Sequence, residues 1–235
     1  MSKGKLYLIP SPLGDNEPVE VLPAPVLEIL PTLDCFVVEE VRTARRFLSR
    51  AGLKGRIEGL EFHVLNEHTA PAEIAPLGHL FDDGRNVGLI SEAGLPAVAD
   101  PGAQLVALCH REGVEVVPLV GPSSLMLALM ASGLNGQSFA FAGYIPAKTE
   151  ERRAAIRRLE KRSAAERQTQ IIIETPYRND ALLADPAATC SDKTLITVAA
   201  NLTQPDAFIR TQPAARWKEH PVTIGKRQCV FLLLA

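Results

Sequence analysis

Short apolar runs that end in turns rich in Gly, Pro and Ser are the feature that most limits how this chain can fold. In the first half of the chain, four such runs predict buried strands, at residues 5–9, 35–38, 87–90 and 114–117. Helical patterns follow at residues 41–51, 102–112 and 125–131. Strands that alternate with helices are typical of a mostly parallel sheet with helices on its faces.

The second half of the chain has a different pattern. Its predicted strands lie at residues 138–143, 171–173, 195–200 and 229–235, with residues 208–209 as a further candidate. One long charged helix is predicted at residues 148–167, and fewer helices separate these strands than in the first half, which favours a mixed sheet. We therefore predict two α/β domains, residues 1–118 with a mostly parallel sheet and residues 119–235 with a mixed sheet.

Charge and hydropathy exclude several classes of protein. The 235 residues include 25 Lys and Arg against 27 Asp and Glu, so the net charge of −2 gives no overall signature of nucleic-acid binding. Any contact with nucleic acid must come from a local patch. No apolar run reaches the roughly 18 residues that span a bilayer, and no signal-peptide pattern opens the chain. We expect a cytoplasmic protein with no membrane partner.

Motifs for metals and for the common nucleotide folds are missing from the sequence. The four cysteines, Cys35, Cys109, Cys190 and Cys229, are widely spaced, so we expect buried thiols, no disulfide framework and no metal site. There is no G-x-G, no P-loop motif and no G-x-S-x-G, which argues against Rossmann dehydrogenases, P-loop ATPases and serine hydrolases.

Four strand ends carry the turns where a ligand could bind. These turns lie at residues 10–15, 91–96, 121–124 and 175–178. In open α/β sheets, ligands bind at the carboxyl ends of the strands, and small residues there let a ligand approach the backbone. One such turn alone is unremarkable in a globular chain. Together, the four predict a small-molecule site lined by backbone.

These turns also carry motifs that resemble a known family. The motifs include Pro10-Ser11-Pro12-Leu13-Gly14, Ser91-Glu92-Ala93-Gly94-Leu95-Pro96, Asp100-Pro101-Gly102, Gly121-Pro122-Ser123-Ser124 and Glu174-Thr175-Pro176-Tyr177-Arg178. In this order they resemble the tetrapyrrole methylase superfamily, the class III S-adenosylmethionine-dependent methyltransferases. Within it, the chain is most similar to the branch of the 16S ribosomal RNA (cytidine-2′-O)-methyltransferases. The resemblance extends from Leu6 to about Leu234.

The resemblance implies a cofactor, a site and partners. It implies S-adenosylmethionine bound in a cleft between the two domains, a homodimer, and RNA or a ribosomal subunit as partner. Matched motif by motif, the cofactor-binding residues are Pro10, Ser91, Glu92, Ala93, Gly94, Leu95, Ser123, Ser124, Thr175, Pro176, Ala200, Asn201 and Lys226. Physical chemistry agrees at Ser123 and Ser124, because a predicted helix begins there and its free N–H groups can hold a carboxylate.

Contact with the substrate is expected from residues that follow other strands. Glu40 is a candidate catalytic base, although an acid is also favoured at a helix start for structural reasons. The candidate substrate-binding residues are Arg42, Arg45, His68, Tyr177 and Arg178. Two of these arginines belong to a basic run, residues 42–56, that contains no acid before Glu58 and could contact phosphates.

Three functions remain open at the level of the sequence. The first is an S-adenosylmethionine-dependent methyltransferase acting on RNA, with ribose 2′-O-methylation of 16S ribosomal RNA as the pattern. The second is a methyltransferase for a small molecule such as a tetrapyrrole, and the third is a cofactor-binding protein without catalysis. Asn201 and Lys226 stand where the ribosomal branch has carboxylates, and Glu92 stands where the family commonly has Asp. These differences leave the second and third functions open.

Overall fold

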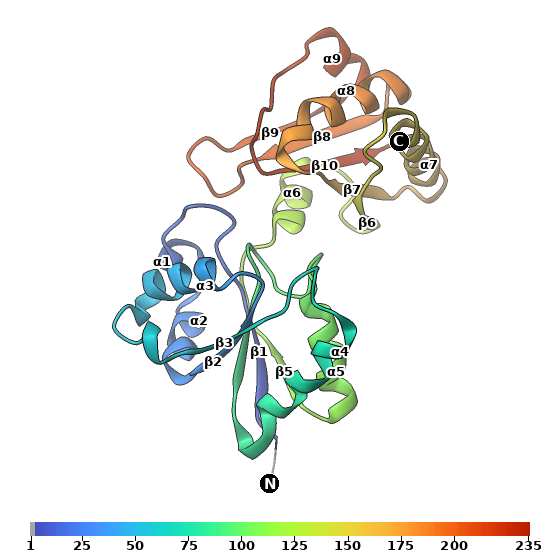
Figure 1. The fold of residues 1–235 in the computed structure, drawn as a ribbon. Coiled ribbons are helices and arrows are strands. Elements are labelled where there is room, and N and C mark those ends of the chain that lie inside the picture. The colour runs from blue at the N-terminus through green and yellow to red at the C-terminus, as the bar shows by residue number, and fades with distance from the viewer. Residues whose placement is uncertain (1–2) are drawn as a thin grey trace. The chain divides into compact units, whose positions relative to one another are not determined.

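The chain divides into two compact units. In the computed structural model, which describes residues 3–235, the first unit runs to Ser123 and the second covers Ser124–Ala235 (Figure 1). The sequence suggested a boundary at residue 118, at the end of a strand. The loop beyond that strand still belongs to the first unit, because the Leu119 amide donates a hydrogen bond to the Leu8 carbonyl at 3.1 Å.

The first unit is built on a five-stranded parallel sheet. In spatial order the strands are β3 (Glu61–Val64), β2 (Cys35–Val38), β4 (Val87–Ile90), β1 (Lys5–Ile9) and β5 (Glu115–Pro118). Every residue of β2 and β4 is buried, as expected for inner strands of a parallel sheet covered on both faces. This confirms the prediction of a parallel sheet.

Helices cover both faces of this sheet (Figure 1). On one face lie α1 (Pro18–Val21), α2 (Ala24–Ile29) and α3 (Val41–Leu48), and on the other α4 (Pro71–Ile74) and α5 (Gly102–Glu112). Alternate residues of a strand point to opposite faces. Phe36 of β2 therefore packs with Phe47 of α3, whereas Val37 packs with Leu105 of α5.

The second unit contains a mixed five-stranded sheet. Its strands, in spatial order, are β6 (Phe139–Tyr144), β7 (Thr169–Ile173), β10 (Cys229–Leu234), β8 (Leu195–Ala200) and β9 (Phe208–Pro213). β6 and β7 are parallel, and the other pairs are antiparallel. The prediction of a mixed sheet, and with it of two α/β domains, is confirmed.

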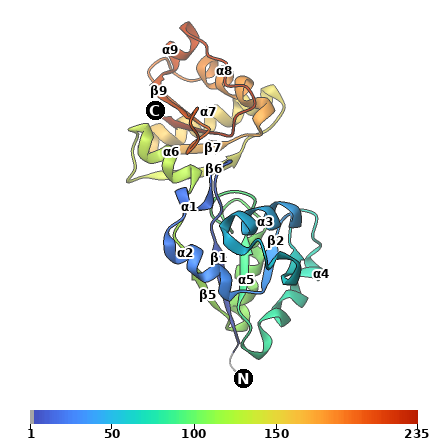
Figure 2. The ribbon, with the colours of Figure 1, turned by 90° about the vertical axis from the view of Figure 1, so that its left-hand side faces the viewer.

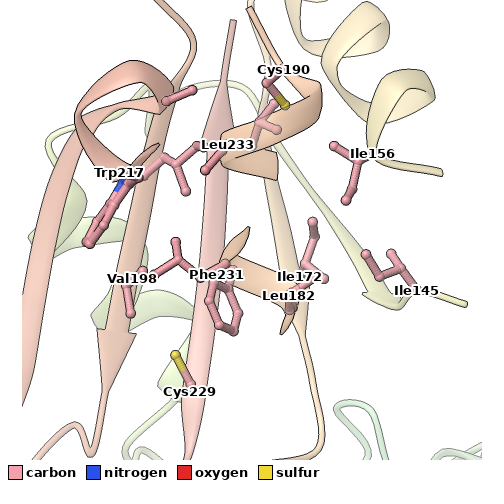
Figure 3. Packing of buried hydrophobic residues seen from close by; sticks show 14 of the residues in the cluster. Ile145, Ile156, Ile172, Leu182, Cys190, Val198, Trp217, Cys229, Phe231 and Leu233 are labelled. Atoms are coloured by element: carbon pink, nitrogen blue, oxygen red, sulfur yellow. The ribbon is translucent and has the colours of Figure 1, made fainter. Parts of the chain in front are cut away.

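The core of the second unit lies on one face of its sheet. There, α7 (Thr149–Glu166), α8 (Asn179–Thr189) and α9 (Ala214–Glu219) pack on the strands, while α6 (Ser124–Ser132) contacts β10, β9 and β8 from the other side (Figure 2). Figure 3 shows Phe231 of β10 between Val198 and Ile172, with Trp217 above. The buried Trp217 donates its indole N–H to the Ile196 carbonyl at 3.0 Å.

The sequence analysis missed two helices that lie between the C-terminal strands, α8 and α9. α8 is buried on most of its sides, including Asn179, Leu182, Asp185 and Ala187, and it contains Pro186. Its exposed positions 181, 184 and 188 are alanines, while polar Asn179 and Asp185 are buried, so polarity does not follow the helical period and the sequence gives no helical signal. The prediction of buried thiols is confirmed for all four cysteines.

Candidate functional site

Hydrogen bonds join two loops at the carboxyl edge of the first sheet. The loops after β1 and β4 meet because these strands are parallel neighbours. The Ser11 amide donates to the Gly94 carbonyl at 2.9 Å, and the Gly94 amide donates to the Ser11 carbonyl at 3.1 Å. The Ser11 hydroxyl donates to the Ser91 carbonyl at 3.1 Å. Gly94 has φ 77°, a left-handed conformation that favours glycine, so this turn depends on it.

The loop after β5 packs at the same edge. β5 is the other neighbour of β1. A Cβ atom on Gly121 would lie only 2.2 Å from the Cβ of Pro10, so glycine is required for this approach. The predicted cofactor-binding residues Pro10 and Ser91–Leu95 therefore lie on one edge of the sheet, together with the segment that leads to Ser123.

Three carboxylates gather between β2 and β4. The Glu92 amide donates to Glu39 Oε1 at 3.1 Å, and Glu40 Oε1 accepts a hydrogen bond from the Arg42 amide at 2.9 Å. Glu40 thus caps the N-terminus of α3. Partial burial raises the pKa of Glu92, and the charges of Glu39 and Glu40 add to this rise, while a hydrogen bond from Thr43 opposes it. A raised proton affinity suits a general base, so Glu92 is a candidate for that role.

A cavity of about 350 Å³ opens beside these acids, entirely within the first unit. It lies between the loop after β1, the ends of β2 and β4, and α3. Its lining residues are Ser11, Pro12, Gly14, Asp15, Asn16, Pro18, Val38, Thr43, Ala44, Arg46, Phe47, Arg50, Ile90, Ser91 and Glu92. Thr43 and Phe47 escaped the sequence analysis. The one sequence feature that could have identified them as site residues is their position on the helix that directly follows Glu39 and Glu40.

Asp100 supports the loop that carries the Ser91–Leu95 segment. Its Oδ1 accepts hydrogen bonds from the amides of Ala97 at 2.8 Å and Gly102 at 2.7 Å. Burial raises the pKa of Asp100 to about 6, and its buried Oδ2 has no hydrogen-bond partner within residues 3–235. Ala97 and Ala99 have φ values of 64° and 61°, so this loop holds two non-glycine residues in the left-handed region.

Acids from other segments neutralise part of the basic run on α3. Arg45 pairs with Glu58 at 2.9 Å, and Arg50 pairs with Asp15 at 2.6 Å. Within the part of the chain that the structure describes, Arg42 and Arg46 form no ion pair, and both are exposed. The free positive charge of the run is therefore smaller than the sequence suggests: among the described residues, its exposed cations without an ion pair are Arg42, Arg46, Lys54 and Arg56.

His68 lies at the end of the same edge. It follows β3, the outermost strand, and its side chain is 84% exposed. Its amide donates to Asn66 Oδ1 at 2.9 Å, which fixes the turn after the strand. The structure therefore places His68 at the carboxyl edge but beyond β2, away from β1 and β4.

The site residues predicted in the second unit also share one edge of a sheet. The carboxyl ends of β7 and β8 lie beside the start of β10, since Val230 pairs with Ile173 and Cys229 pairs with Ala200. This arrangement brings together Thr175, Pro176, Ala200, Asn201 and the exposed Lys226. Ser124, the remaining one, is the first residue of α6.

Asn201 connects two turns at this edge. It has φ 47°, its amide donates to the Gln228 carbonyl at 2.8 Å, and its Oδ1 accepts from the Gln228 amide at 3.1 Å. Asn179, which the sequence analysis missed, donates from Nδ2 to the carbonyls of Gly225 at 2.9 Å and Arg227 at 2.7 Å. These bonds hold the turn that carries Lys226.

Glu174 organises the turn after β7. Its side chain is fully buried, and its Oε1 accepts from Arg178 Nη2 at 2.5 Å and from the Thr175 amide at 2.7 Å. Arg178 also lies over the ring of Tyr177, with the guanidinium carbon 5.6 Å from the ring centre. Arg178, predicted to bind substrate, is thus occupied with a buried carboxylate, whereas Tyr177 is 72% exposed.

One group of possible metal ligands lies at the opposite, amino end of β2 and β3. Ligand atoms of Cys35, Glu61 and His63 lie within 4.8 Å of one another. Glu61, however, already bonds His63 Nε2 at 2.7 Å and Arg85 Nη1 at 2.6 Å. The Arg85 guanidinium contributes the positive charge that a cation would otherwise supply, and the expectation of no metal site stays a prediction.

Comparison with known proteins places the chain in a family. Residues 5–216 match the family described as Tetrapyrrole (Corrin/Porphyrin) Methylases. The ribosomal RNA small subunit methyltransferase I of Escherichia coli O157:H7 is 32% identical over 99% of this chain and 78% of its own length. No helix of residues 3–235 combines the length and the apolar character needed to cross a bilayer.

Two solved structures share the fold. The methyltransferase CobJ superposes with a TM-score of 0.64 at 18% identity, covering 98% of this chain and 94% of its own. Uroporphyrin-III C-methyl transferase from Thermus thermophilus, complexed with S-adenyl homocysteine, has a TM-score of 0.56 at 19% identity and covers 98% of this chain and 97% of its own. By sequence and by fold, the chain belongs to the tetrapyrrole methylase family.

Proposed function

We propose that this chain is an S-adenosylmethionine-dependent methyltransferase that methylates RNA of the small ribosomal subunit. The family match and the 32% identity to a ribosomal RNA small subunit methyltransferase over nearly the whole chain support this function. The structural observation that carries it is the carboxyl edge of the first sheet, where the loops after β1, β4 and β5 are tied together around Gly94 and Gly121.

The residues present fit the cofactor. S-adenosylmethionine carries ribose hydroxyls, an ammonium group and a carboxylate. The backbone of Ser91–Leu95 and the Glu92 carboxylate suit the hydroxyls or the ammonium. The first turn of α6, which begins at Ser124, suits the carboxylate, because free N–H groups and the positive end of the helix dipole favour an anion there.

The chain contributes alignment and a proton acceptor. When bound, the cofactor supplies an electrophilic methyl group on a sulfonium. Holding a ribose 2′-oxygen in line with that carbon lowers the barrier by orientation. Methyl transfer to that oxygen would also require the chain to provide a base that accepts the hydroxyl proton. We assign this proton to Glu92 rather than Glu40, since Glu40 already caps α3.

Arg42 and Arg46 are the proposed contacts for RNA phosphates. Both are exposed, Arg42 in the first turn of α3 and Arg46 in its last turn, and neither forms an ion pair in the described part of the chain. Arg45 is the weaker choice because Glu58 already holds it. Exposed Tyr177 is a candidate for stacking on an unpaired base. Action on ribosomal RNA places the protein in the cytoplasm.

Binding of the cofactor is the first test. Isothermal titration with S-adenosylmethionine and S-adenosylhomocysteine is expected to give micromolar affinity, and Ser124→Trp is expected to abolish it by filling the first turn of α6. Thr149→Trp at the start of α7 is the matched control and should bind as wild type does. A folded wild-type protein that binds neither compound contradicts the proposal.

Transfer of a labelled methyl group then identifies the acceptor. Small ribosomal subunits and their RNA should be labelled in a single turnover. Labelling of a tetrapyrrole in place of RNA points to the small-molecule alternative, and cofactor binding without transfer to either points to a protein that has lost catalysis.

A homodimer is the proposed assembly. On the face of the second sheet that α6 contacts, large apolar side chains are exposed on α6, β6 and β9. They are Met126, Met130, Phe139, Phe141 and Ile209. Side chains of this kind on one face favour contact with another protein surface, here a second copy of the chain.

Sedimentation velocity tests the assembly. Wild type should sediment as a dimer, and Met130→Glu together with Phe141→Glu should sediment as a monomer. Val19→Glu changes an exposed apolar residue on α1, in the first unit, and serves as the control. If wild type is a monomer at all concentrations, the proposed dimer is contradicted, but the proposed methyltransferase activity is not.

A further inference from the structure

The lining of the cavity in the first unit overlaps only partly with the predicted cofactor-binding residues. Of those residues in this unit, only Ser91 and Glu92 line the cavity, while Pro10, Ala93 and Gly94 do not. The two sets therefore meet at one point, the end of β4. A methyl donor and its acceptor need this arrangement, because the reacting atoms must come together across one short contact.

The lining of the cavity combines an apolar floor with a charged rim. Val38, Phe47 and Ile90 are buried and supply apolar contact, including one aromatic ring. At the rim, Arg46 is exposed and Thr43 hydrogen-bonds the Glu92 carboxylate. An apolar and aromatic floor suits a flat base, an arginine suits a phosphate, and hydroxyl and carboxylate groups suit amino or ribose groups.

The size of the cavity limits the occupant to a small unit. Its volume of about 350 Å³ lies at the lower end of small-molecule sites. It can take one nucleoside but no base-paired helix. Enzymes that modify a nucleotide commonly extrude it from its stack into such a pocket.

We propose that this cavity receives one unstacked nucleoside of the RNA acceptor, a role that rests on the proposed function. The base lies against Phe47 and Ile90, Arg46 meets the adjacent phosphate, and the ribose points to the meeting point at Ser91 and Glu92. Thr43, Arg46 and Phe47 are thereby substrate-binding residues that no family motif supplied.

Thr43→Phe is the main test, because it places a ring inside the cavity. Val41→Phe adds the same ring on the same helix outside the lining and is the matched control. Binding of the four nucleoside 5′-monophosphates is measured by saturation-transfer NMR. Binding of S-adenosylmethionine is measured by calorimetry. Both readouts are made on the full chain, with thermal unfolding as the check that each variant is folded.

The expected result separates the two ligands. At least one monophosphate binds wild type and Val41→Phe but not Thr43→Phe, while all three proteins bind S-adenosylmethionine alike. Loss of cofactor binding in folded Thr43→Phe assigns the cavity to the cofactor and overturns the inference. Absence of binding by all four monophosphates to wild type, or RNA methylation by Thr43→Phe at the wild-type rate, also overturns it.

Arg46→Ala gives a second test that avoids changes to the core. Loss of a charge-assisted phosphate contact should weaken monophosphate binding roughly tenfold and leave free nucleoside binding unchanged. Arg111→Ala, an exposed arginine on α5, should change neither. Equal binding of the monophosphate by Arg46→Ala and wild type contradicts the assignment of Arg46. If the protein binds a monophosphate but transfers no methyl group to RNA, the proposed function is contradicted, while the assignment of the cavity as a nucleotide-binding pocket still holds.

Discussion

Asp100 connects the protonation of a single carboxylate to the stability of the loop after β4. Burial raises its pKa from the ordinary 3.8 to about 6, so the folded state holds this proton more tightly than the unfolded state does. The contribution of Asp100 to the free energy of unfolding is therefore fully present below about pH 4 and is lost as the pH rises through about 6.

Asp100→Asn tests this dependence. The amide oxygen still accepts hydrogen bonds from Ala97 and Gly102 but does not titrate. The free energy of unfolding of wild type minus that of Asp100→Asn should fall between pH 4 and pH 6.5, as measured by urea unfolding. Other carboxylates titrate equally in both proteins and cancel. A difference that stays constant or rises over this range contradicts the raised pKa.

Arg178 and Glu174 form a pair whose removal should be costly. Arg178→Ala leaves the fully buried Glu174 carboxylate without its cation. Breaking a buried ion pair on one side lowers the free energy of unfolding by about 3 kcal/mol. The double variant Glu174→Gln with Arg178→Met should recover most of this loss. Arg162→Ala removes an exposed pair with Glu166 and should cost less than about 0.5 kcal/mol, measured by the same denaturant titration.

At the scale of elements, the close approach of two loops depends on Gly121. In Gly121→Ala, the new Cβ would lie 2.2 Å from the rigid ring of Pro10, so the loops after β1 and β5 must separate. We expect a loss of about 1–3 kcal/mol in the free energy of unfolding and weaker binding of S-adenosylmethionine. At Gly59 a Cβ meets no atom of residues 3–235 within 4 Å, so Gly59→Ala should change neither the free energy of unfolding nor the binding of S-adenosylmethionine. Equal cofactor affinity in both variants contradicts a role for this contact.

The sequence predicted most of the elements because their local signals agree with the fold. Buried parallel strands are short apolar runs, and α5 ends at Gly113, which has φ 71°. α8 gave no signal because its exposed face carries alanines and its buried face includes Asn179 and Asp185. At the site, the Ser91–Leu95 segment could be predicted from its motif. Thr43 and Phe47 could not, because their role arises only when α3 packs beside the loop after β1.

At the scale of the whole molecule, the proposed binding to RNA cannot come from net charge, which is −2. It must come from a local group of cations that acids leave unpaired, and such a group is hard to identify from sequence because Glu58 lies 13 residues beyond the Arg45 it neutralises. Arg42→Ala should lower the slope of log affinity for RNA against log salt concentration by about 0.7–0.9.

Arg45→Ala is the control for this salt titration. Its guanidinium already pairs with Glu58 and lies 5.9 Å from the ring centre of Phe62, so its loss should leave the slope unchanged. Affinity can be followed by fluorescence anisotropy of a labelled RNA. Equal slopes for wild type and Arg42→Ala are the outcome that contradicts a phosphate contact at the start of α3.

The central place of β10 in the second sheet has a consequence for biosynthesis. β10 is the last strand in chain order, yet it pairs with both β7 and β8. The strands of the first sheet all precede residue 119, so that sheet can assemble while the second half of the chain is still being translated. The second sheet must wait for residues 229–234 to leave the ribosome, and until then β7 and β8 are exposed edges that a chaperone can cover.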